Sequence, residues 1–562
     1  MIIKDSDKST FKWLYNSSKK QVPEIIALIV VYCLFSSMVI IMAWLSKGLV
    51  DSSVSGNHSQ LIRFMIIVGA VVIPRLLLSF KYRGLNEHSR ARLEILLRQK
   101  IFTSILQKDY SRISDYHSGE LLNRLINDIG VIVDGAISIL PSLFGLLTKL
   151  LLAFFALFSI EKKFALVFAA GGVLIFVTTR AFRKVMKRLH KDVQQTEGVS
   201  RSFFQEALEN SLVIKVFGAE KSVLKKSGNL LDLNYKKKIK RILVSIFANL
   251  GMSAVFNAGY YFAFFWGAYG IYTTAISYGT LTAVLQLVNQ IQSPVSGLSG
   301  LIPRYYSLIA SAERLIEIEN LPREAEYAST VTDINDFYEK INSIEFKDIT
   351  FAYKNETVIE GTSLSIKKGE FVAVAGISGI GKSTLLKLLL GVLIPNTGSI
   401  YFNLGTSKRK TDKGVRGLFA YVPQGNMLLS GTILENVTFL NNNKTDKEIR
   451  DAIRISCMDS FVDELPDGLN TVIGERGKGL SEGQVQRIAI ARAILSGAPI
   501  LLLDEATAAL DEKTEKKLLE NIRQLENKTC IIISHKHAAI EACDKEVRIV
   551  DKKIVLMQES AK

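Results

Sequence analysis

The 562-residue sequence has only four cysteines, and their spacing excludes two kinds of site. Cys33, Cys457, Cys530 and Cys543 form no CxxC or CxxC-H pattern. We therefore predict neither a disulfide framework nor a cysteine metal site. A secretory signal peptide is also not predicted, because no small-residue cleavage site follows the first apolar run and five more such runs come after it. For residues 1–20, which carry mixed charge and a small aromatic cluster, we expect a short helix lying in a membrane interface.

Acidic residues are the minority among the charged ones. There are 54 Asp and Glu against 70 Lys and Arg, which gives a formal net charge of +16. Such an excess is compatible with a nucleic-acid partner, but the basic residues cluster beside long apolar runs. That clustering favours anionic lipid and cytoplasmic loops, and we predict no binding of nucleic acid.

The apolar excess is confined to residues 1–320, for which we predict an all-α transmembrane domain. The mean hydropathy of the whole chain is +0.22 and 48% of its residues are hydrophobic. A run of about 20 apolar residues is long enough to cross a hydrocarbon core of about 30 Å. Six such spans are predicted, at residues 25–46, 61–80, 135–160, 164–180, 242–269 and 276–302.

The segments between the spans alternate in length. Spans one and two, three and four, and five and six are joined by short segments, whereas the other two connections are long and rich in Lys and Arg. The positive-inside rule places these long segments and both termini in the cytoplasm. The Lys-rich amphipathic runs within these segments contain no Pro or Gly break, so the helices are expected to extend beyond the bilayer.

Polar residues inside the predicted spans are candidates for a substrate pathway. Lys149 lies mid-span, where an ionisable group usually faces a bundle interior or a water-filled cavity. A structural pair or a misplaced span boundary is the alternative. Gln286, Asn289, Gln290 and Ser293 recur at helical spacing and so share one face. That face either lines a translocation pathway or makes interhelical hydrogen bonds.

Residues 321–340 are polar and are predicted to form a linker, and residues 341–562 a soluble α/β domain. Within this domain, GISGIGKST at 376–384 follows an apolar strand-like run and precedes a helix-like run. This arrangement matches a P-loop, whose backbone N–H groups surround phosphates, with Lys382 reaching the β/γ-phosphates and Ser383 holding Mg²⁺. The residues predicted to bind nucleotide here are Gly376, Ser378, Gly379, Gly381, Lys382, Ser383 and Thr384.

A second element, ILLLDE at 500–505, supplies the acids that a nucleotide site requires. Four apolar residues predict a buried central strand that brings Asp504 and Glu505 to the edge of the sheet, where α/β folds bind ligands. Asp504 is expected to coordinate Mg²⁺ through its water shell, and Glu505 to act as general base toward the attacking water. Tyr353, upstream of the loop, is a candidate for stacking on adenine.

Further motifs resemble those of ATP-binding cassette (ABC) proteins. LSEGQ at 480–484 resembles the family's signature motif, Gln424 in YVPQ its Q-loop, Asp511 in ALD its D-loop, and His535 in IISH its switch histidine. TVIGERG at 471–477 resembles a segment characteristic of ABC exporters. With six predicted spans ahead of these motifs, nearly the whole chain is similar to bacterial half-transporters of the exporter type. Residues 118–128 and 206–220 resemble that family's cytoplasmic coupling segments.

The resemblance implies a dimer in which the signature of each chain contacts nucleotide held by the other. Ser481, Gly483 and Gln484 would then bind in trans, Asp511 would complete the nucleotide site, and Gln424 and His535 would join Glu505 in catalysis, Gln424 also at Mg²⁺. Glu482 replaces the usual glycine, and we expect its side chain to point away from the phosphates. Because no catalytic residue is missing from the chain, a homodimer is predicted, with a heterodimer as the alternative.

The expected activity is ATP-driven export of a drug, lipid or peptide across a bacterial plasma membrane by alternating access. ATP and Mg²⁺ are the expected cofactors. An ATP-gated channel or regulatory membrane protein is the rival, although the presence of both Glu505 and His535 favours a pump. An importer is a third alternative. No sequence feature selects the substrate.

Overall fold

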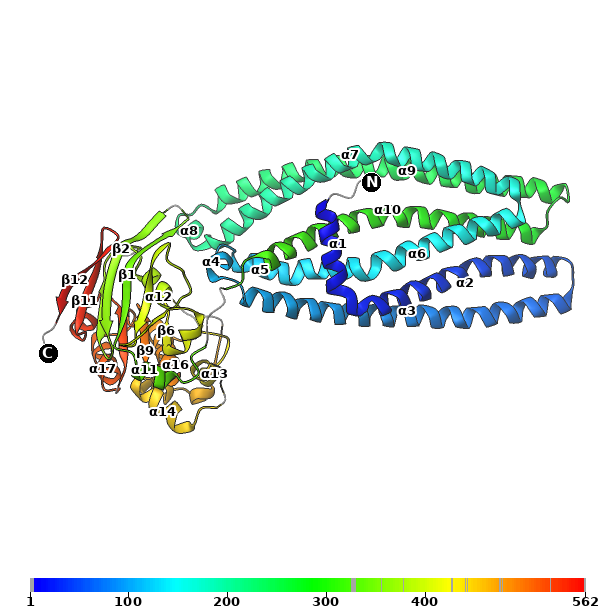
Figure 1. Ribbon diagram of the computed structural model, residues 1–562. Coiled ribbons are helices and arrows are strands. Elements are labelled where there is room, and N and C mark those ends of the chain that lie inside the picture. Colours follow the sequence, from blue (N-terminus) through cyan, green and yellow to red (C-terminus); the bar gives the residue numbers. More distant parts are fainter. Residues whose placement is uncertain are drawn as a thin grey trace. The chain divides into compact units, whose positions relative to one another are not determined.

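The computed structural model describes residues 5–324, 330–354, 356–377, 379–425, 428–439, 441, 443–474, 477, 479–525 and 527–559, with the backbone alone over most of 163–184. The chain forms two compact units. One comprises Met1–Ile105 and Ser118–Asn320, and the other Leu106–His117 and Leu321–Lys562. We call them the helical unit and the nucleotide unit (Figure 1).

The helical unit is built from long helices joined by tight turns (Figure 1). Its helices are α1 (Asp5–Ser18), α2 (Val22–Val54), α3 (His58–Leu106), α5 (Ser118–Asn123), α6 (Ile129–Ile160), α7 (Lys162–Glu209), α8 (Ser211–Val216), α9 (Glu220–Tyr272) and α10 (Tyr278–Asn320), with a 3₁₀ turn at Lys19–Gln21 and a π turn at Arg124–Asp128. Helices of 43 to 53 residues are far longer than a bilayer requires, in agreement with the expected extension of the spans.

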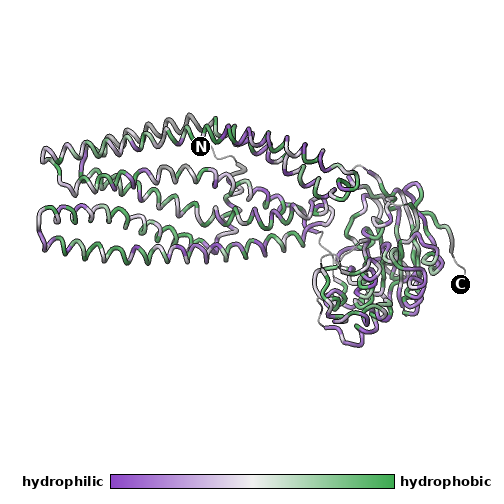
Figure 2. The backbone as a smooth tube through the Cα atoms, turned by 180° about the vertical axis from the view of Figure 1, so that it is seen from behind, coloured by the Kyte–Doolittle hydropathy of each residue, from purple (hydrophilic) through white to green (hydrophobic). Residues whose placement is uncertain are grey.

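Four described segments, at Lys8–Val54, His58–Leu106, Ser118–Ile160 and Glu220–Tyr272, are long and apolar enough to cross a membrane. They contain four of the predicted spans. The span at 164–180 lies in α7, where most side chains are outside the described part. The span at 276–302 falls almost entirely in α10, whose amides lower its hydropathy. These two spans stay predictions. Figure 2 shows the apolar and hydrophilic stretches along the helices.

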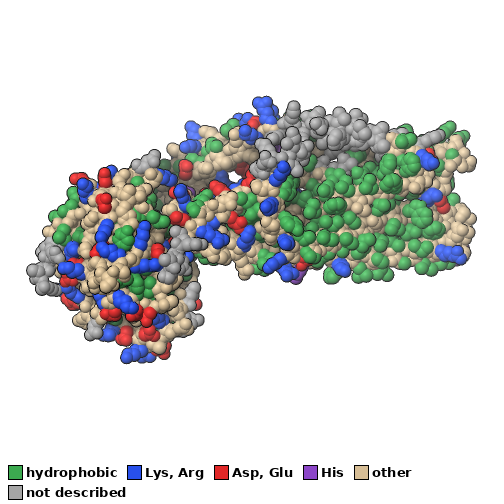
Figure 3. Space-filling view, in the orientation of Figure 1, with side chains coloured by type: hydrophobic (Ala, Val, Ile, Leu, Met, Phe, Trp, Pro, Cys, Tyr) green, Lys and Arg blue, Asp and Glu red, His purple; other side chains and the backbone are tan. Residues whose placement is uncertain are grey.

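Much of the apolar surface of the helical unit is not covered by the unit itself. Side chains along α3 such as Ile66 and Phe80 are 66% and 80% exposed. Figure 3 shows hydrophobic side chains gathered over one half of the unit and charged ones over the other half. A continuous exposed apolar belt of this size is unfavourable in water, so lipid or a second protein chain must cover it.

Charged residues lie at the start of α6 and the end of α10. The carboxylate of Asp128 accepts hydrogen bonds from Ser311 Oγ at 2.9 Å and from Arg314 Nε at 2.8 Å. Asp128 is 3% exposed. Arg124, also buried, donates to Glu317 at 3.0 Å and to Glu120 at 2.6 Å. We call this the Asp128 cluster. Buried charges are tolerated there because each has an opposite partner.

The nucleotide unit contains two main sheets. An antiparallel sheet has the order β2-β1-β4-β5, and a mainly parallel sheet the order β12-β11-β3-β10-β9-β6. The first consists of β1 (Ser343–Tyr353), β2 (Glu356–Lys367), β4 (Thr397–Asn403) and β5 (Lys408–Lys410), and the second of β3 (Phe371–Ala375), β6 (Phe419–Val422), β9 (Ile500–Asp504), β10 (Thr529–Ile533), β11 (Lys545–Val550) and β12 (Lys553–Glu559). β7 (Gly431–Thr432) pairs with β8 (Val472–Ile473).

Helices cover the parallel sheet, as expected for strands whose side chains are buried on both faces. All five residues of β3, β9 and β10 are buried. The helices of this unit are α4 (Tyr110–Ile113), α11 (Ile334–Glu339), α12 (Lys382–Leu389), α13 (Ile433–Thr438), α14 (Asp446–Ile455), α15 (Asp459–Val462), α16 (Glu482–Leu495), α17 (Glu512–Arg523) and α18 (His537–Glu541). This architecture confirms the predicted fold class.

The predicted linker at 321–340 needs a correction in its second half. Asp333 caps α11 by accepting a hydrogen bond from the backbone N–H of Asp336. Tyr338 is 3% exposed and belongs to the core of the nucleotide unit, where its hydroxyl contacts Thr529 at 2.7 Å. The polar composition concealed a short helix that packs through a few apolar residues.

Candidate functional site

The predicted catalytic residues come from four neighbouring parallel strands. In the sheet, β3, β10, β9 and β6 follow one another, and each adjacent pair is parallel. The P-loop follows β3, His535 follows β10, Asp504 and Glu505 end β9, and Gln424 follows β6. Since the carboxyl ends of parallel strands meet at one edge of the sheet, residues far apart in sequence are brought together there.

The phosphate loop has the backbone conformation that its glycines were predicted to provide. Gly376, Gly379 and Gly381 have φ angles of 144°, 82° and 112°. A Cβ atom at Gly381 would lie 2.4 Å from Val358 Cγ1, so this position has no space for a side chain. Ser378 lies outside the described residues. Gly381 is the N-cap of α12, which places the helix N-terminus at the loop.

The side chain of Lys382 is held inside the phosphate loop by hydrogen bonds. Its Nζ donates to the carbonyl oxygens of Gly376 at 2.7 Å and Ile377 at 3.1 Å, and the residue is 5% exposed. Burial lowers the pKa of Lys382, while the carboxylates of Glu505 and Asp504 act to raise it. A phosphate entering the loop would therefore meet a pre-oriented ammonium group.

Ser383 and Asp504 form the oxygen pair expected for Mg²⁺. Ser383 Oγ donates to Asp504 Oδ1 at 3.0 Å, and the hydroxyl of Tyr421 donates to Oδ2 at 3.1 Å. Asp504 is 1% exposed. Burial raises the pKa of Asp504, and the hydrogen bonds from Ser383 and Tyr421 oppose that rise. A hydroxyl and a buried carboxylate beside the phosphate loop fit a hard divalent cation.

Glu505, Gln424 and His535 lie together next to the loop. Gln424 Nε2 donates to Glu505 Oε2 at 2.6 Å, and His535 Nε2 lies 3.7 Å from Glu505 Oε1 and 3.0 Å from Lys382 Nζ. Glu505 has a φ of 51°, in the left-handed region that a residue with a side chain rarely adopts. Such a strained conformation is typical of active sites, where surrounding contacts hold it in place.

The segment that resembles the signature motif is a helix N-terminus. Ser481 caps α16: its Oγ accepts from the backbone N–H of Gln484 at 3.3 Å, and Gln484 Oε1 accepts from the N–H of Ser481 at 2.8 Å. Glu482 is exposed, and the expected direction of its side chain, away from the phosphates, stays a prediction. A Cβ atom at Gly483 would lie 3.0 Å from the carbonyl oxygen of Ala509, so a side chain here would disturb the D-loop.

Asp511 and Tyr353 complete the set of predicted nucleotide-binding residues. Asp511 caps α17 by accepting from the N–H of Thr514 at 2.9 Å. Over the described part of the chain, no hydrogen bond or ion pair joins Asp511, Ser481 or Gln484 to the phosphate loop. Tyr353, by contrast, is 43% exposed, and its hydroxyl lies 3.4 Å from Thr384 Oγ1, so its ring is next to the loop.

Two family models match the chain. Residues 25–295 match the ABC transporter transmembrane region, and residues 359–508 match the ABC transporter model. A putative export ATP-binding/permease protein from Rickettsia bellii is 30% identical over 463 residues, which cover 81% of this chain and 79% of the relative. The chain belongs to the ABC exporter family.

Other relatives agree with this assignment. An ATP-dependent lipid A-core flippase from Desulfotalea psychrophila is 27% identical over 517 residues, covering 91% of this exporter chain and 90% of the relative. The solved structure of a bacterial Atm1-family ABC exporter with ATP bound matches with a TM-score of 0.79 and 21% identity, covering 96% of this chain and 95% of the other. At that identity the match supports the fold alone.

Sequence reasoning missed Tyr421 and the segment Leu106–His117 of this exporter chain. Tyr421 stands three residues before Gln424, and burial raises its pKa, so its hydroxyl stays a donor to Asp504. The segment Leu106–His117 belongs to the nucleotide unit. Lys387 Nζ lies 5.8 Å from the centroid of the Tyr110 ring, and Asp115 forms an ion pair with Lys354 at 3.5 Å. No motif marks these residues. The predicted coupling segments at 118–128 and 206–220 stay predictions.

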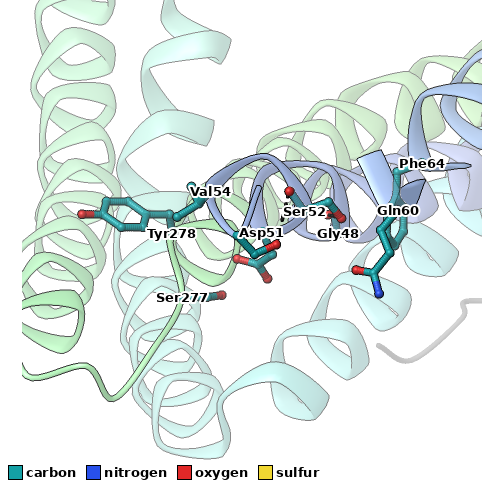
Figure 4. Close-up of a pocket in the computed structure, with 9 residues that line it drawn as sticks. Gly48, Asp51, Ser52, Val54, Gln60, Phe64, Ser277 and Tyr278 are labelled. Carbon is teal, nitrogen blue, oxygen red and sulfur yellow. Dashed lines mark hydrogen bonds between the residues drawn. The ribbon is translucent and has the colours of Figure 1, made fainter. Parts of the chain in front are cut away.

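The polar residues predicted for the substrate pathway lie on α6 and α10. Lys149 Nζ donates to Ser293 Oγ at 2.7 Å. Gln286 and Asn289 are exposed, and Gln290 is half-buried. A separate cavity of about 450 Å³ lies between the α2–α3 turn and the start of α10 (Figure 4). It contains none of the predicted residues; in it, Asp51 accepts from the N–H of Gly279 at 2.8 Å.

Proposed function

We propose that this chain is one half of a dimeric pump that hydrolyses ATP to export an amphipathic or hydrophobic molecule. One observation carries the proposal. Lys382, Asp504, Glu505, Gln424 and His535 follow four neighbouring strands at a single edge of the parallel sheet, where Lys382 lies 3.0 Å from His535, Ser383 bonds to Asp504 at 3.0 Å, and Gln424 bonds to Glu505 at 2.6 Å.

Each side chain has a role that follows from its contacts. Lys382 and the N-terminus of α12 bind the β- and γ-phosphates. Ser383 and Asp504 would hold Mg²⁺, which would neutralise phosphate charge when bound. Glu505 orients the attacking water and accepts its proton, while Gln424, bound to Glu505 at 2.6 Å, keeps that carboxylate in place. His535, 3.0 Å from Lys382 Nζ, lies where a γ-phosphate would replace the lysine as its partner.

The signature segment would complete the site of a second copy. Ser481 Oγ and the N-terminus of α16 suit a terminal phosphate, and no contact among the described residues joins them to the phosphate loop of their own chain. A homodimer with two equivalent sites follows from the full set of catalytic residues on one polypeptide. We place the protein in a bacterial inner membrane. The two long basic connections between the predicted spans, and both termini, lie in the cytoplasm.

The exported molecule is expected to be a drug, lipid or peptide with substantial apolar surface. The exposed apolar belt and the amides on α10 support a pathway open to such molecules. The name of the Desulfotalea relative refers to lipid A-core, and we take from it only that a lipid belongs among the candidates.

Transport in proteoliposomes tests this proposal. With ATP and Mg²⁺ on the side of the nucleotide unit, wild type should move a labelled drug, lipid or peptide, and Glu505→Gln should bind ATP without sustained transport. An ATP-gated channel predicts instead that Glu505→Gln passes substrate down its gradient as soon as ATP binds. An importer would move substrate in the opposite direction.

A further inference from the structure

The 506–511 loop follows the proposed general base and joins β9 to α17. Near its two ends the loop is buried: Thr507 and Leu510 are 1% and 7% exposed. Ala508 and Ala509, which lie between them, form an exposed tip. Because the tip has little burial of its own, side chains from neighbouring elements must set its position.

Lys536, on the segment that follows β10, bonds to this loop twice. Its Nζ donates to the carbonyl oxygen of Thr507 at 3.0 Å and to that of Leu510 at 2.6 Å. These two carbonyl groups lie on either side of the exposed tip. An ammonium group has three N–H donors, so it can bond to both oxygens at once. The lysine therefore joins the 506–511 loop to the segment that carries His535, which directly precedes it.

A buried carboxylate contacts both the lysine and the loop. Glu515 on α17 is fully buried. Its Oε1 accepts a hydrogen bond from Thr507 Oγ1 at 2.6 Å, and its Oε2 lies 3.4 Å from Lys536 Nζ. A buried carboxylate is costly without an opposite charge, and among the described residues Lys536 is the cation that pairs with it. Glu515 therefore holds the ammonium group next to the two loop carbonyls.

The tip of the loop contacts the first turns of α16. Gln486 Oε1 accepts a hydrogen bond from the backbone N–H of Ala509 at 3.0 Å. Gly483, on the same helix, packs closely on the loop, because a Cβ atom there would lie 3.0 Å from the carbonyl oxygen of Ala509 and 3.4 Å from Leu510 Cδ2. The start of this helix also carries Ser481, which we propose to act on the nucleotide of a second copy. The loop therefore lies between the histidine segment and the signature segment.

We propose that Lys536 is a positioning residue of the hydrolysis site. Its two bonds make the 506–511 loop follow the segment that carries His535, so that a shift of the histidine toward a γ-phosphate reaches the start of α16. Glu515 keeps the lysine in place. This inference rests on the proposed function, because it assigns the bonds to a hydrolysis cycle shared by two copies. The alternative is that Lys536 only neutralises the buried carboxylate of Glu515.

ATPase kinetics of the full-length protein in nanodiscs test the positioning role. Lys536→Met should lower kcat by about tenfold or more, while the affinity for a fluorescent ATP analogue stays within about twofold of wild type, because the lysine bonds to the 506–511 loop and not to the phosphate loop. Lys536→Arg keeps a cation with several donors and should stay within about threefold in kcat. Lys516→Met is the matched control, since Lys516 is exposed and adjoins Glu515 on α17; it should match wild type. A wild-type kcat in Lys536→Met would overturn the inference.

A double variant separates positioning from charge neutralisation. Lys536→Met leaves the carboxylate of Glu515 buried without its cation and should lower the unfolding temperature. Adding Glu515→Gln removes that charge, and the new amide oxygen still accepts from Thr507, so the unfolding temperature should recover. The kcat of the double variant should stay as low as that of Lys536→Met, because the two bonds to the loop carbonyls are still missing. Recovery of kcat together with the unfolding temperature would show that the lysine only neutralises Glu515.

Amide hydrogen exchange tests the same bonds without nucleotide. The N–H groups of Ala508, Ala509 and Leu510 are all hydrogen-bonded, so their exchange reports the order of the loop. In a peptide covering 506–511, exchange should be about fivefold faster or more in Lys536→Met and in the double variant, and unchanged in the matched control. Faster exchange in a protein that does not hydrolyse ATP would remove the pump and leave the link between lysine and loop. Hydrolysis by wild type with unchanged exchange in Lys536→Met would do the reverse.

Discussion

The two units treat their polar residues in opposite ways. In the nucleotide unit, the charged and polar side chains at the edge of the parallel sheet contact one another: Ser383 bonds to Asp504, and Glu505 contacts both Gln424 and His535. In the predicted spans of the helical unit, Lys149 contacts Ser293 at 2.7 Å, and over the described residues Gln286, Asn289 and Gln290 hydrogen-bond to no other helix. The first arrangement suits the single reaction that we propose for it, the hydrolysis of ATP. The second leaves amide groups available to the proposed substrate.

The largest effect, a loss of ATP affinity, is expected for a substitution of Lys382 at the edge of the parallel sheet. Lys382→Ala removes a buried ammonium that is already oriented toward the phosphates, so ATP affinity should fall by about 100-fold or more. Equilibrium binding of a fluorescent ATP analogue to the purified protein measures this. Lys410→Ala on exposed β5 is the control and should bind ATP normally. If Lys382→Ala bound ATP with wild-type affinity, the polar residues at the sheet edge would not be the nucleotide site.

A second prediction concerns the Asp128 cluster, where the helical unit pairs buried charges. Asp128→Asn leaves Arg314 without its carboxylate and should destabilise the protein by about 2–4 kcal/mol, since Asp128 is almost fully buried. Asp134→Asn on α6, which directly follows the π turn that contains Asp128, is the matched control. Asp134 pairs with Arg90 while 57% exposed, and its loss should cost about 0–1 kcal/mol. Thermal unfolding compares the two, and equal losses would contradict the difference in burial.

Sequence alone predicted the nucleotide unit well because its motifs have fixed spacing and each follows a strand. Gly376–Lys382 and Asp504–Glu505 are each a few contiguous residues, so their local geometry required no knowledge of the fold. What brings them together is the order β3-β10-β9-β6, which no local pattern reveals. Tyr421 was missed for this reason: its role depends on β6 lying beside β9.

The contacts within the helical unit were less predictable. Apolar runs in the sequence predict where a helix lies, but not which other helix it packs against. Lys149 was singled out by its charge, yet its partner Ser293 lies 144 residues away and was assigned only to a helix face. The segment Leu106–His117 was not expected to join the nucleotide unit, since some of its contacts are with backbone groups such as the carbonyl of Leu321, 2.6 Å from Lys108 Nζ. Backbone contacts leave no sequence pattern.

A smaller effect is expected for Tyr421, and it should show whether this residue positions Asp504 or takes part in the chemical step. Tyr421→Phe removes one hydrogen bond to Asp504, worth about 1 kcal/mol. The Mg²⁺ concentration for half-maximal hydrolysis should then rise by about fivefold, with little change in the rate at saturating Mg²⁺. A fall in the saturating rate with no change in the Mg²⁺ requirement would place Tyr421 in the chemical step instead.

The smallest effect is expected at a surface ion pair of the nucleotide unit. Hydrogen bonds from Lys408 and Asn403 lower the pKa of Glu345 to about 2. Because the folded pKa lies below the unfolded one, the pair stabilises the fold at neutral pH and loses this contribution as pH falls from about 4.5 toward 2. Lys408→Met should therefore lower the unfolding temperature slightly at pH 7 and progressively less below pH 4.5. An unfolding-temperature difference that grows on acidification would contradict this sign.

The central claim is that the sheet edge hydrolyses ATP and that this reaction responds to what the helices bind. The most direct measurement is the ATPase rate of the purified protein in nanodiscs, with and without panels of drugs, lipids and peptides, for wild type and Glu505→Gln. We predict hydrolysis that one of these classes of compound stimulates, and a loss of at least about 100-fold in Glu505→Gln with ATP binding intact. Hydrolysis at the wild-type rate in Glu505→Gln would contradict the account.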